Sequence, residues 1–410
     1  MLISLSWKNV FRNKFRSSLV IFSIASGLTG GIFYMAFSNG MAQEQISNSI
    51  NTYVSNIQIQ NPKYLLNDEI EYRIRNVKDK ISKISQLPEV KGVCSRLRLQ
   101  AMIATAETGT GVYVYGVDPQ TEKQVTDIHS KVYAGKYFNP KIKNPIVLGK
   151  KLAEKLNVKP KSKVVITLQD TEGNITSGLF RVAGIFDAHN SIFEEGNVFV
   201  RKKDLANLIE INPTEATEIA ILLKHNDLTK SVANKIKQIF AAEIQSGELA
   251  VRTWDEIEPM LKMINQMTME FNMIFLMIIL VAVGFGVVNT MLMSVMERKR
   301  EIGVLMAIGM NRGKVFLMIL LETFFLSFTG AFAGITLAAV IIVITNKIGI
   351  DLSELSKGLS SWGYSPIVRP ELHAEYYFLI ALLIILAAFV ASIFPARKAL
   401  KINPSEATRL

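Results

Sequence analysis

Four stretches of the sequence are long, apolar and free of charge, and each contains at least 21 consecutive uncharged residues. A helix of about 20 apolar residues is long enough to cross the hydrocarbon core of a bilayer. The sequence therefore predicts a membrane protein with four transmembrane helices. We expect these helices near residues 18–40, 271–295, 315–345 and 376–395.

The positive charges are concentrated on one side of the predicted membrane. Two long polar segments, 44–270 and 347–375, share one side, whereas the N-terminus, the 295–314 loop and the C-terminus share the other. That second side carries thirteen Lys and Arg residues against three Glu, which is +10 of the formal net charge of +11. Because loops rich in Lys and Arg stay in the cytoplasm, we predict that this side is cytoplasmic. The basic composition is explained by topology, and no nucleic-acid partner is predicted.

The polar segment 44–270 is long enough for one sizeable domain or two small ones. An order of strand, helix and strand near its beginning recurs near its end, which predicts two β-α-β halves of one mixed subdomain. Between these halves the chain reads mostly as strands. A short helix is expected over Ile146–Leu156, and two strands further along are joined by a tight turn at Asp170–Asn174.

Little in the chain predicts catalysis. The four histidines are scattered, and the single cysteine, Cys94, excludes an internal disulfide. Motifs of zinc proteases, serine hydrolases and dithiol redox proteins are missing from the sequence. Asp187, His189, Glu194 and Glu195 are close in sequence and suggest a metal site, but a polar loop between two strands explains them equally well. We predict no catalytic residue, no metal site and no cofactor held by this chain.

A near match to a phosphate-binding loop occurs at 309–315. Such a loop needs four residues between its first glycine and the Gly-Lys pair, and then Ser or Thr. Here three residues separate Gly309 from Gly313, and Val315 follows Lys314. We therefore predict that ATP and Mg are bound by a partner ATPase.

The third span contains two unusual features. Glu322 is an acid within the span, and such residues are often functional. The alternative, which we favour, is that Glu322 lies near the cytoplasmic interface and hydrogen-bonds neighbouring helices. Gly330 and Gly334 either permit close helix contact or simply add flexibility.

The loop at 295–309 reads VMERKREIGVLMAIG, with charged and apolar residues at helical spacing. This pattern predicts a short amphipathic helix that suits docking to a soluble subunit. The alternative is a helix that lies on the membrane surface. The loop resembles the E-R-x-R-E-I-G-x-L-x-A-x-G segment of MacB-type ABC transporter permeases, the FtsX-like superfamily. Residues 7–16 and 395–407 resemble the same superfamily, as does the layout of one span, a large domain and three spans. Residues 55–64 and 182–200 look most like its lipoprotein-releasing, Lol-type branch.

The resemblance implies an α-helical membrane protein with four transmembrane helices and a large α+β periplasmic domain that has porter-like and Sabre-like parts. The first region, 1–43, holds the cytoplasmic N-terminus and the first span. The periplasmic domain is 44–270, with porter-like parts at 44–114 and 213–254, a Sabre-like insertion at 115–212 and a stalk helix at 255–270. Spans two to four occupy 271–410, with the cytoplasmic coupling loop at 295–314 and a periplasmic loop at 347–375.

The implied function is that of a permease subunit of an ABC transporter in the bacterial inner membrane. ATP hydrolysis by a partner subunit would drive the extraction of lipoproteins from the outer leaflet of that membrane by mechanotransmission. The implied partners are ABC ATPase subunits, a second permease copy or a paralogue in a dimer, and a lipoprotein. Some Lol-type permeases recruit a periplasmic chaperone through an extended hairpin, the hook. Here that connection is only the turn at 170–177, so chaperone recruitment is left open.

Two groups of site residues are predicted. A coupling group would contact the ATPase, and it comprises Glu297, Arg298, Arg300, Glu301, Ile302, Gly303, Leu305, Ala307 and Gly309. A substrate-cavity group would surround the acyl chains, where adaptable methionines are suitable, and it comprises Phe33, Met35, Phe37, Met267, Phe271, Ile274 and Met277. For any single member of the second group, helix packing or lipid contact is an equally good explanation.

Three other functions remain open. A MacB-like efflux permease would need a periplasmic adaptor, and an FtsX-like mechanotransmitter would control a periplasmic partner without bound lipid. A membrane-anchored enzyme is the third, although the sequence contains no recognisable set of catalytic residues. The sequence leaves the substrate and the choice between homodimer and heterodimer undetermined.

Overall fold

The computed structural model describes residues 14–353 and 366–401, together with residues 3, 6–8, 12, 358 and 364. The chain divides into two compact units. The helical unit comprises residues 1–42, 265–351 and 367–410, and the mixed unit comprises residues 43–264 and 352–366. Parts of the motifs at 7–16 and 395–407, and of the 347–375 loop, lie outside the described residues.

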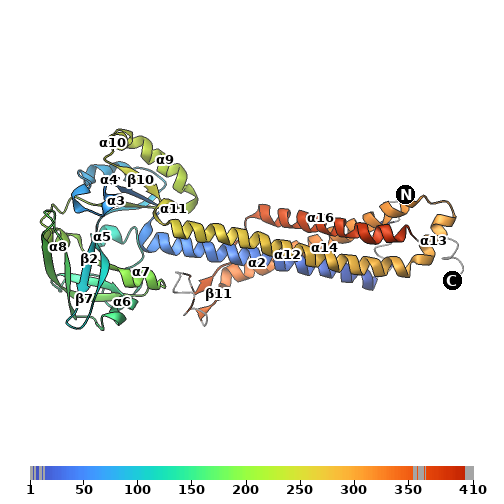
Figure 1. The fold of residues 1–410 in the computed structure, drawn as a ribbon, viewed down its shortest axis with the longest axis horizontal. Helices are drawn as coiled ribbons and strands as arrows, with labels where there is room; N and C mark the ends of the chain where they lie inside the picture. Colours follow the sequence, from blue (N-terminus) through green and yellow to red (C-terminus); the bar gives the residue numbers. More distant parts are fainter. Residues whose placement is uncertain are drawn as a thin grey trace. The chain divides into compact units, whose positions relative to one another are not determined.

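The helical unit contains helices that are long and apolar enough to cross a membrane, and four such helices occur in the described part of the chain. Each of the four predicted spans lies within one of them, so this prediction is confirmed. They are α2 (Lys14–Ser49), α12 (Pro259–Glu297), α14 (Arg312–Ile348) and α16 (Ala374–Ala399), with the short α13 (Lys299–Ala307) between α12 and α14. Figure 1 shows that α13 lies at the end of the helical unit where α14 begins and α16 ends. A small strand pair, β11 (Ile350–Asp351) and β12 (Ile367–Val368), also belongs to this unit.

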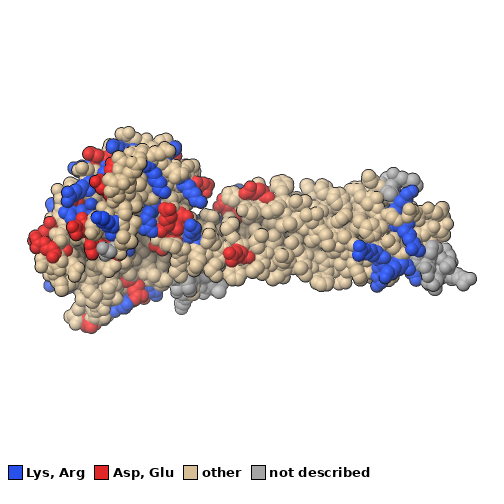
Figure 2. All heavy atoms as spheres, turned by 45° about the horizontal axis from the view of Figure 1, so that its top comes forward, with Lys and Arg blue, Asp and Glu red and all other residues tan. Residues whose placement is uncertain are grey.

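The core of the helical unit is built from apolar side chains four residues apart. This spacing puts them on one face of each helix, where they meet the same stripe of a neighbouring helix. On α2 they are Ile24, Leu28, Ile32 and Ala36, on α12 Val283, Val287 and Met291, and on α16 Ile380, Ile384 and Ala388. The outer surface carries a broad band without charge, and Lys and Arg gather at the end where α13 lies (Figure 2). This distribution suits a bilayer span with one basic border.

The contact between α2 and α14 depends on small residues. A Cβ atom at Gly334 would lie 2.9 Å from the Leu28 Cβ, and one at Gly330 would lie 3.0 Å from the Ile24 Cβ. The interpretation of these glycines as a close-contact surface is therefore confirmed.

The mixed unit is built on one ten-stranded sheet with the order β10-β1-β9-β2-β3-β8-β5-β7-β4, and β6 pairs with both β2 and β7. The first half of the long strand β2 pairs with β9, and its second half pairs with β3 and β6. As a result β2, β3, β8, β5, β7 and β6 form a closed ring. The strands are β1 (Ile57–Gln60), β2 (Val90–Ala104), β3 (Gly109–Val117), β4 (Val132–Gly135), β5 (Pro145–Gly149), β6 (Lys163–Gln169), β7 (Ile175–Phe186), β8 (Asn197–Arg201), β9 (Glu218–Leu223) and β10 (Ala250–Thr253).

Short helices cover this sheet. The side chains of α4 and α9 form one core with β1, β9 and β10, whereas those of α6 and α8 pack into the ring. The helices are α3 (Tyr64–Asn67), α4 (Val77–Ser85), α5 (Pro119–Glu122), α6 (Lys150–Lys155), α7 (Ser191–Gly196), α8 (Lys202–Leu208), α9 (Thr229–Ile239), α10 (Ala241–Gln245) and α11 (Trp254–Ile257). Three single turns complete the unit, the π-turn η1 (Ile50–Val54) and the 3-10 turns η2 (Ile70–Tyr72) and η3 (Asn226–Leu228).

Two expectations about local structure are corrected. The helix expected over Ile146–Leu156 begins only at Lys150, because Ile146–Leu148 are fully buried and pair with a strand on each side. The stalk helix expected over 255–270 is divided into α11 and α12. Pro259 is the first residue of α12, a position where the missing N–H of proline leaves no helical hydrogen bond unmade.

Candidate functional site

The segment around α13 joins α12 to α14 by two tight connections. Arg298 leaves helical geometry with φ −96° and ψ 13°, so α12 ends and α13 begins there. Gly309 adopts a φ of +102°, a conformation that favours glycine. The side chain of Asn311 then accepts a hydrogen bond from the Gly313 N–H at 3.1 Å and caps α14. The near match to a phosphate-binding loop is therefore a turn between two helices.

α13 has one side buried in the helical unit and one side open. Ile302 and Gly303 are buried. The exposed positions mix charged and apolar groups. Among the coupling group, Glu297, Arg300, Glu301, Ala307 and Gly309 are exposed, whereas Arg298 and Leu305 are half-buried.

A chain of charges attaches α13 to its neighbours. Arg298 Nη1 donates to both carboxylate oxygens of Glu322, at 3.2 and 3.1 Å, and Arg298 Nε donates to Glu301 at 3.2 Å. Arg12, which precedes α2, forms a second ion pair with Glu301. This hydrogen bond from Arg12 is the main reason why the pKa of Glu301 lies below its ordinary value. Glu301 therefore stays ionised and holds two arginines from different parts of the chain.

Glu322 is 7% exposed on α14, so its charge needs a partner. Arg298 supplies that partner, in agreement with our favoured interpretation that Glu322 bonds a neighbouring element. A cavity of about 260 Å³ lies beside this pair and is lined by Arg12, Glu297 and Glu301 as well. The pairing itself was not predicted, although an acid inside a span was a reason to search the nearest loop for an arginine.

The substrate-cavity group lies on two helices of the helical unit. Phe33, Met35 and Phe37 of α2 are half-buried, and the rings of Phe33 and Phe37 stack with centroids 6.4 Å apart. The four members on α12 have exposed fractions between 44% and 65%, and they are Met267, Phe271, Ile274 and Met277. Because they are spaced by four, three and three residues, they form an open apolar stripe along α12. Whether this stripe borders a substrate cavity stays a prediction.

The acidic residues around His189 are engaged with groups of the mixed unit. Asp187 pairs with Lys150 at 2.8 Å, and Glu194 accepts hydrogen bonds from the backbone N–H groups of Ala188 and Lys151. Among the described residues no group of three or more potential ligands is placed to hold a metal ion.

Two family models match the sequence. The MacB-like periplasmic core domain matches residues 17–239, more than half of the chain, and the FtsX-like permease C-terminal model matches residues 273–404. The chain belongs to the MacB/FtsX-type superfamily of ABC transporter permeases. It is thus a multi-pass membrane permease with a periplasmic-type domain, as the sequence predicted.

The relatives of this permease carry different cargoes. It is 25% identical to the lipoprotein-releasing system transmembrane protein LolC of Neisseria meningitidis, over 97% of this chain and 95% of that protein. It is 26% identical to the pyoverdine export ATP-binding/permease protein PvdT of Pseudomonas aeruginosa, over 81% of this chain and 50% of that protein. The macrolide export ATP-binding/permease protein MacB of Neisseria gonorrhoeae is 22% identical, over 85% of this chain and 53% of that protein. The permease therefore spans about half the length of the two export proteins.

Proposed function

We propose that this permease releases lipoproteins from the outer leaflet of the bacterial inner membrane, driven by ATP that a partner subunit hydrolyses. The observation that carries this proposal is the end-to-end similarity to LolC, which covers 97% of this chain and 95% of the relative. The turn between β6 and β7 is short and polar, so the proposal does not include recruitment of a chaperone.

In this proposal α13 is the coupling helix. Its exposed residues bind the ATPase, and its buried residues attach it to the helical unit. The ion pair between Arg298 and Glu322 supports this role, because Arg298 Nη1 donates to both carboxylate oxygens and so connects the start of α13 to α14. When the ATPase moves, α13 carries α14 with it. α2 and α12 contribute residues to both units, so they transmit the motion to the periplasmic domain.

The acyl chains of the cargo would contact the apolar stripe of α12. A single chain leaves this stripe open, so a second permease copy or a paralogue completes the enclosure. Methionine is unbranched and polarizable, and Met267 and Met277 therefore adapt to acyl chains of varied length.

The test is to purify the permease from native membranes in mild detergent and to identify bound molecules by mass spectrometry. We expect an ABC ATPase and a triacylated protein, and the subunit ratio distinguishes a homodimer from a heterodimer. An ATPase together with a soluble cell-wall hydrolase, and no acylated cargo, would contradict lipoprotein release and favour mechanotransmission.

A second candidate function is export of small molecules from the periplasm. The similarity to PvdT and MacB, which covers more than four fifths of this chain, favours it. This function requires a periplasmic adaptor, so recovery of an adaptor without acylated protein would replace our proposal.

A further inference from the structure

A short extended segment lies just before α16 and contacts two other spans. It comprises residues 367–372, which we call the clasp, and it begins with β12. Val368 and Pro370 are buried, so the clasp packs into the helical unit. Proline fixes its own φ and disfavours helical geometry at the residue before it. The clasp is therefore a stiff, extended connection.

Three contacts attach the clasp to α14. β12 pairs with β11, which follows α14 directly. Asn346, in the last turn of α14, donates from Nδ2 to the carbonyl oxygen of Pro370 at 3.0 Å. Gly349 ends α14 with a φ of +77°, and a Cβ atom there would lie 2.5 Å from Ile367 Cγ2. These contacts hold the clasp at the end of α14 that is far from α13.

Three further contacts attach the clasp to α2. The Glu371 N–H donates to the carbonyl oxygen of Ala36 at 3.0 Å. Asn39 donates from Nδ2 to the carbonyl oxygen of Glu371, also at 3.0 Å. A Cβ atom at Gly40 would lie 2.3 Å from the carbonyl oxygen of Arg369, so a glycine is needed for the clasp to come this close. One segment thus joins α2 to α14 through directional hydrogen bonds.

The clasp meets α2 just before that helix leaves the helical unit. The helical unit includes α2 up to Ala42, and the rest of the helix belongs to the mixed unit. An earlier contact between α2 and α14 lies at Gly334, which faces Leu28. Leu28 and Ala36 are eight residues apart, or about 12 Å along a helix. Two contacts at this separation fix the direction of α2 relative to α14 as well as its position.

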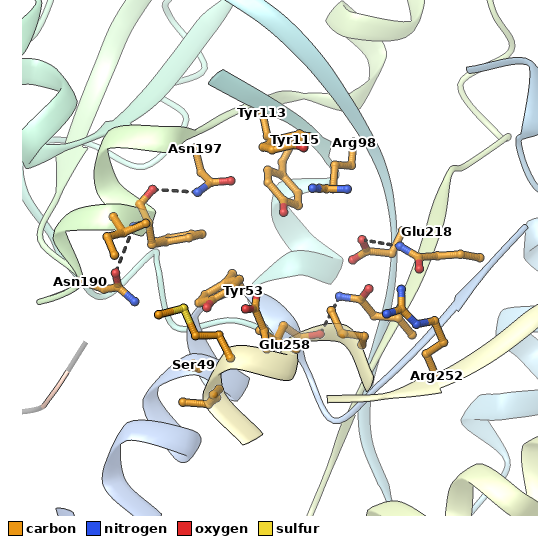
Figure 3. A pocket seen from close by; sticks show the side chains of 18 of the residues that line it. Ser49, Tyr53, Arg98, Tyr113, Tyr115, Asn190, Asn197, Glu218, Arg252 and Glu258 are labelled. Carbon is orange, nitrogen blue, oxygen red and sulfur yellow. Dashed lines mark hydrogen bonds between the residues drawn. The ribbon is translucent and has the colours of Figure 1, made fainter. Parts of the chain in front are cut away.

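The last turns of α2 are anchored in the mixed unit. Ile46 is buried in one of its cores, and Asn48 Oδ1 accepts a hydrogen bond from Lys131 Nζ at 2.8 Å. Figure 3 shows Ser49 and Tyr53, at and just after the end of α2, among the side chains that line a cavity of about 490 Å³ in the same unit. A displacement of α2 at the clasp therefore reaches the mixed unit through these contacts.

We propose that the clasp is a permanent link that makes α2 follow α14 throughout the ATP-driven cycle. In the proposed function α13 displaces α14. The clasp passes this displacement to α2 at the last turns before the mixed unit, with Asn39 and Gly40 as the positioning residues. The inference rests on the ATP-driven part of the proposed function, whereas it does not depend on the identity of the cargo.

The first test measures whether α2 follows α14 in the full-length permease with its ATPase in lipid nanodiscs. Spin labels at Gln43→Cys and Ile348→Cys report the distance between the two helices near the clasp, because both side chains are exposed. The native Cys94 is buried. An excess of unlabelled permease leaves one labelled chain in each complex. The distance distribution is recorded without nucleotide and after trapping with ATP and vanadate.

We expect a narrow distribution in the native background, with the same mean in both states. Gly40→Ala should broaden the distribution and make its mean depend on nucleotide, because the added methyl group displaces the carbonyl group of Arg369. Gly30→Ala is the matched control on the same helix, since a Cβ atom there meets nothing within 4 Å. A nucleotide-dependent mean in the native background, or identical behaviour of the two alanine variants, would overturn the proposal.

The second test restores the link covalently in proteoliposomes. A chain with Asn39→Cys, Gly40→Ala and Glu371→Cys carries a thiol on each side of the contact, and a short bis-methanethiosulfonate bridges the two. Release of a triacylated lipoprotein is divided by the ATP hydrolysed. We expect this ratio to fall about fivefold in the unbridged chain, which is the effect of losing one hydrogen bond. Bridging should restore the ratio, and the same reagent should have no effect on a chain that keeps Glu371.

The two tests keep the proposals apart. Distances that behave as expected, without release by any chain, would reject the proposed function and leave the clasp standing. Release that the unbridged chain retains in full, or that bridging abolishes, would reject the clasp and leave the proposed function standing.

Discussion

At the scale of single residues, the mixed unit depends on a buried charge network at the middle of β2. Arg96 is fully buried and donates to Glu122, to Glu218 and to the carbonyl oxygen of Tyr53, each at 2.8 Å. One guanidinium thus connects β2, β9, α5 and η1. A buried ion that loses its partner is costly. The stability of this region therefore depends on every member of the network.

We expect Arg96→Met to lower the free energy of unfolding by about 3–5 kcal/mol, because two carboxylates would lose their common partner. Thermal unfolding of the purified permease in detergent measures this loss. Arg181→Met is the control, since Arg181 is exposed on β7 and should change the free energy by no more than about 0.5 kcal/mol. Similar melting temperatures for the two variants would show that the network contributes little.

A second residue-scale prediction concerns Lys202, whose Nζ donates to Ser95 Oγ at 2.8 Å. Burial lowers its pKa to about 8, whereas an unfolded lysine titrates near 10.4. Between these values the unfolded chain binds more protons, so this group makes stability rise with pH in that window and leaves it constant below the window.

Lys202→Met removes this titration. The free energy of unfolding of the variant minus that of the native permease should therefore fall by about 2 kcal/mol from pH 7 to pH 10. Denaturant unfolding of both proteins at the two pH values checks this, because the comparison cancels the titration of all other groups. A difference that is constant with pH would mean that Lys202 titrates normally.

At the scale of secondary structure, the success of each prediction depended on the kind of sequence pattern behind it. The spans were predictable because length and hydrophobicity alone decide them, and α13 was predictable from helical spacing and a motif. β5 was mistaken for the start of a helix, since a short buried apolar run has no periodicity that separates the two. The closure of β6 onto β2, and the pair between Arg12 and Glu301, depend on contacts far apart in sequence. Local patterns carry no information about such contacts.

The contact of α14 with α2 gives a prediction at this scale. Gly334→Ala places a methyl group 2.9 Å from the Leu28 Cβ, and we expect a loss of about 1–3 kcal/mol from overpacking. Gly30→Ala on α2 is the matched control, because a Cβ there meets nothing within 4 Å. The control should be neutral or slightly stabilising, since alanine favours helix. Melting temperatures in detergent compare the two, and equal values would contradict the close-contact interpretation.

The coupling role of α13 gives a second prediction at the scale of secondary structure. We expect Glu301→Ala combined with Gly303→Leu to abolish cargo release while ATP hydrolysis by the partner continues, because the helix loses a charge contact and its buried fit. ATPase activity and release are measured on the same proteoliposomes. Arg312→Ala, at the exposed start of α14, is the control. Release that survives the double change would remove α13 from the mechanism.

At the scale of the whole molecule, the charge distribution predicts orientation. The side that contains α13 carries +10 of the net charge of +11, and loops with this excess remain cytoplasmic. Ile308→Cys and Ile192→Cys provide reporters on opposite sides of the predicted membrane, since these side chains are 79% and 69% exposed. The buried Cys94 should give little background.

We expect an impermeant maleimide to label position 192 in cells whose outer membrane has been permeabilised, and to leave position 308 unlabelled. In inside-out inner-membrane vesicles the pattern should reverse, and detergent should allow both to react. The reversed pattern in cells would place the mixed unit in the cytoplasm. It could then not receive lipoproteins from the outer leaflet, and α13 would face away from the ATP that has to drive it, so the orientation is a necessary condition for the proposed function.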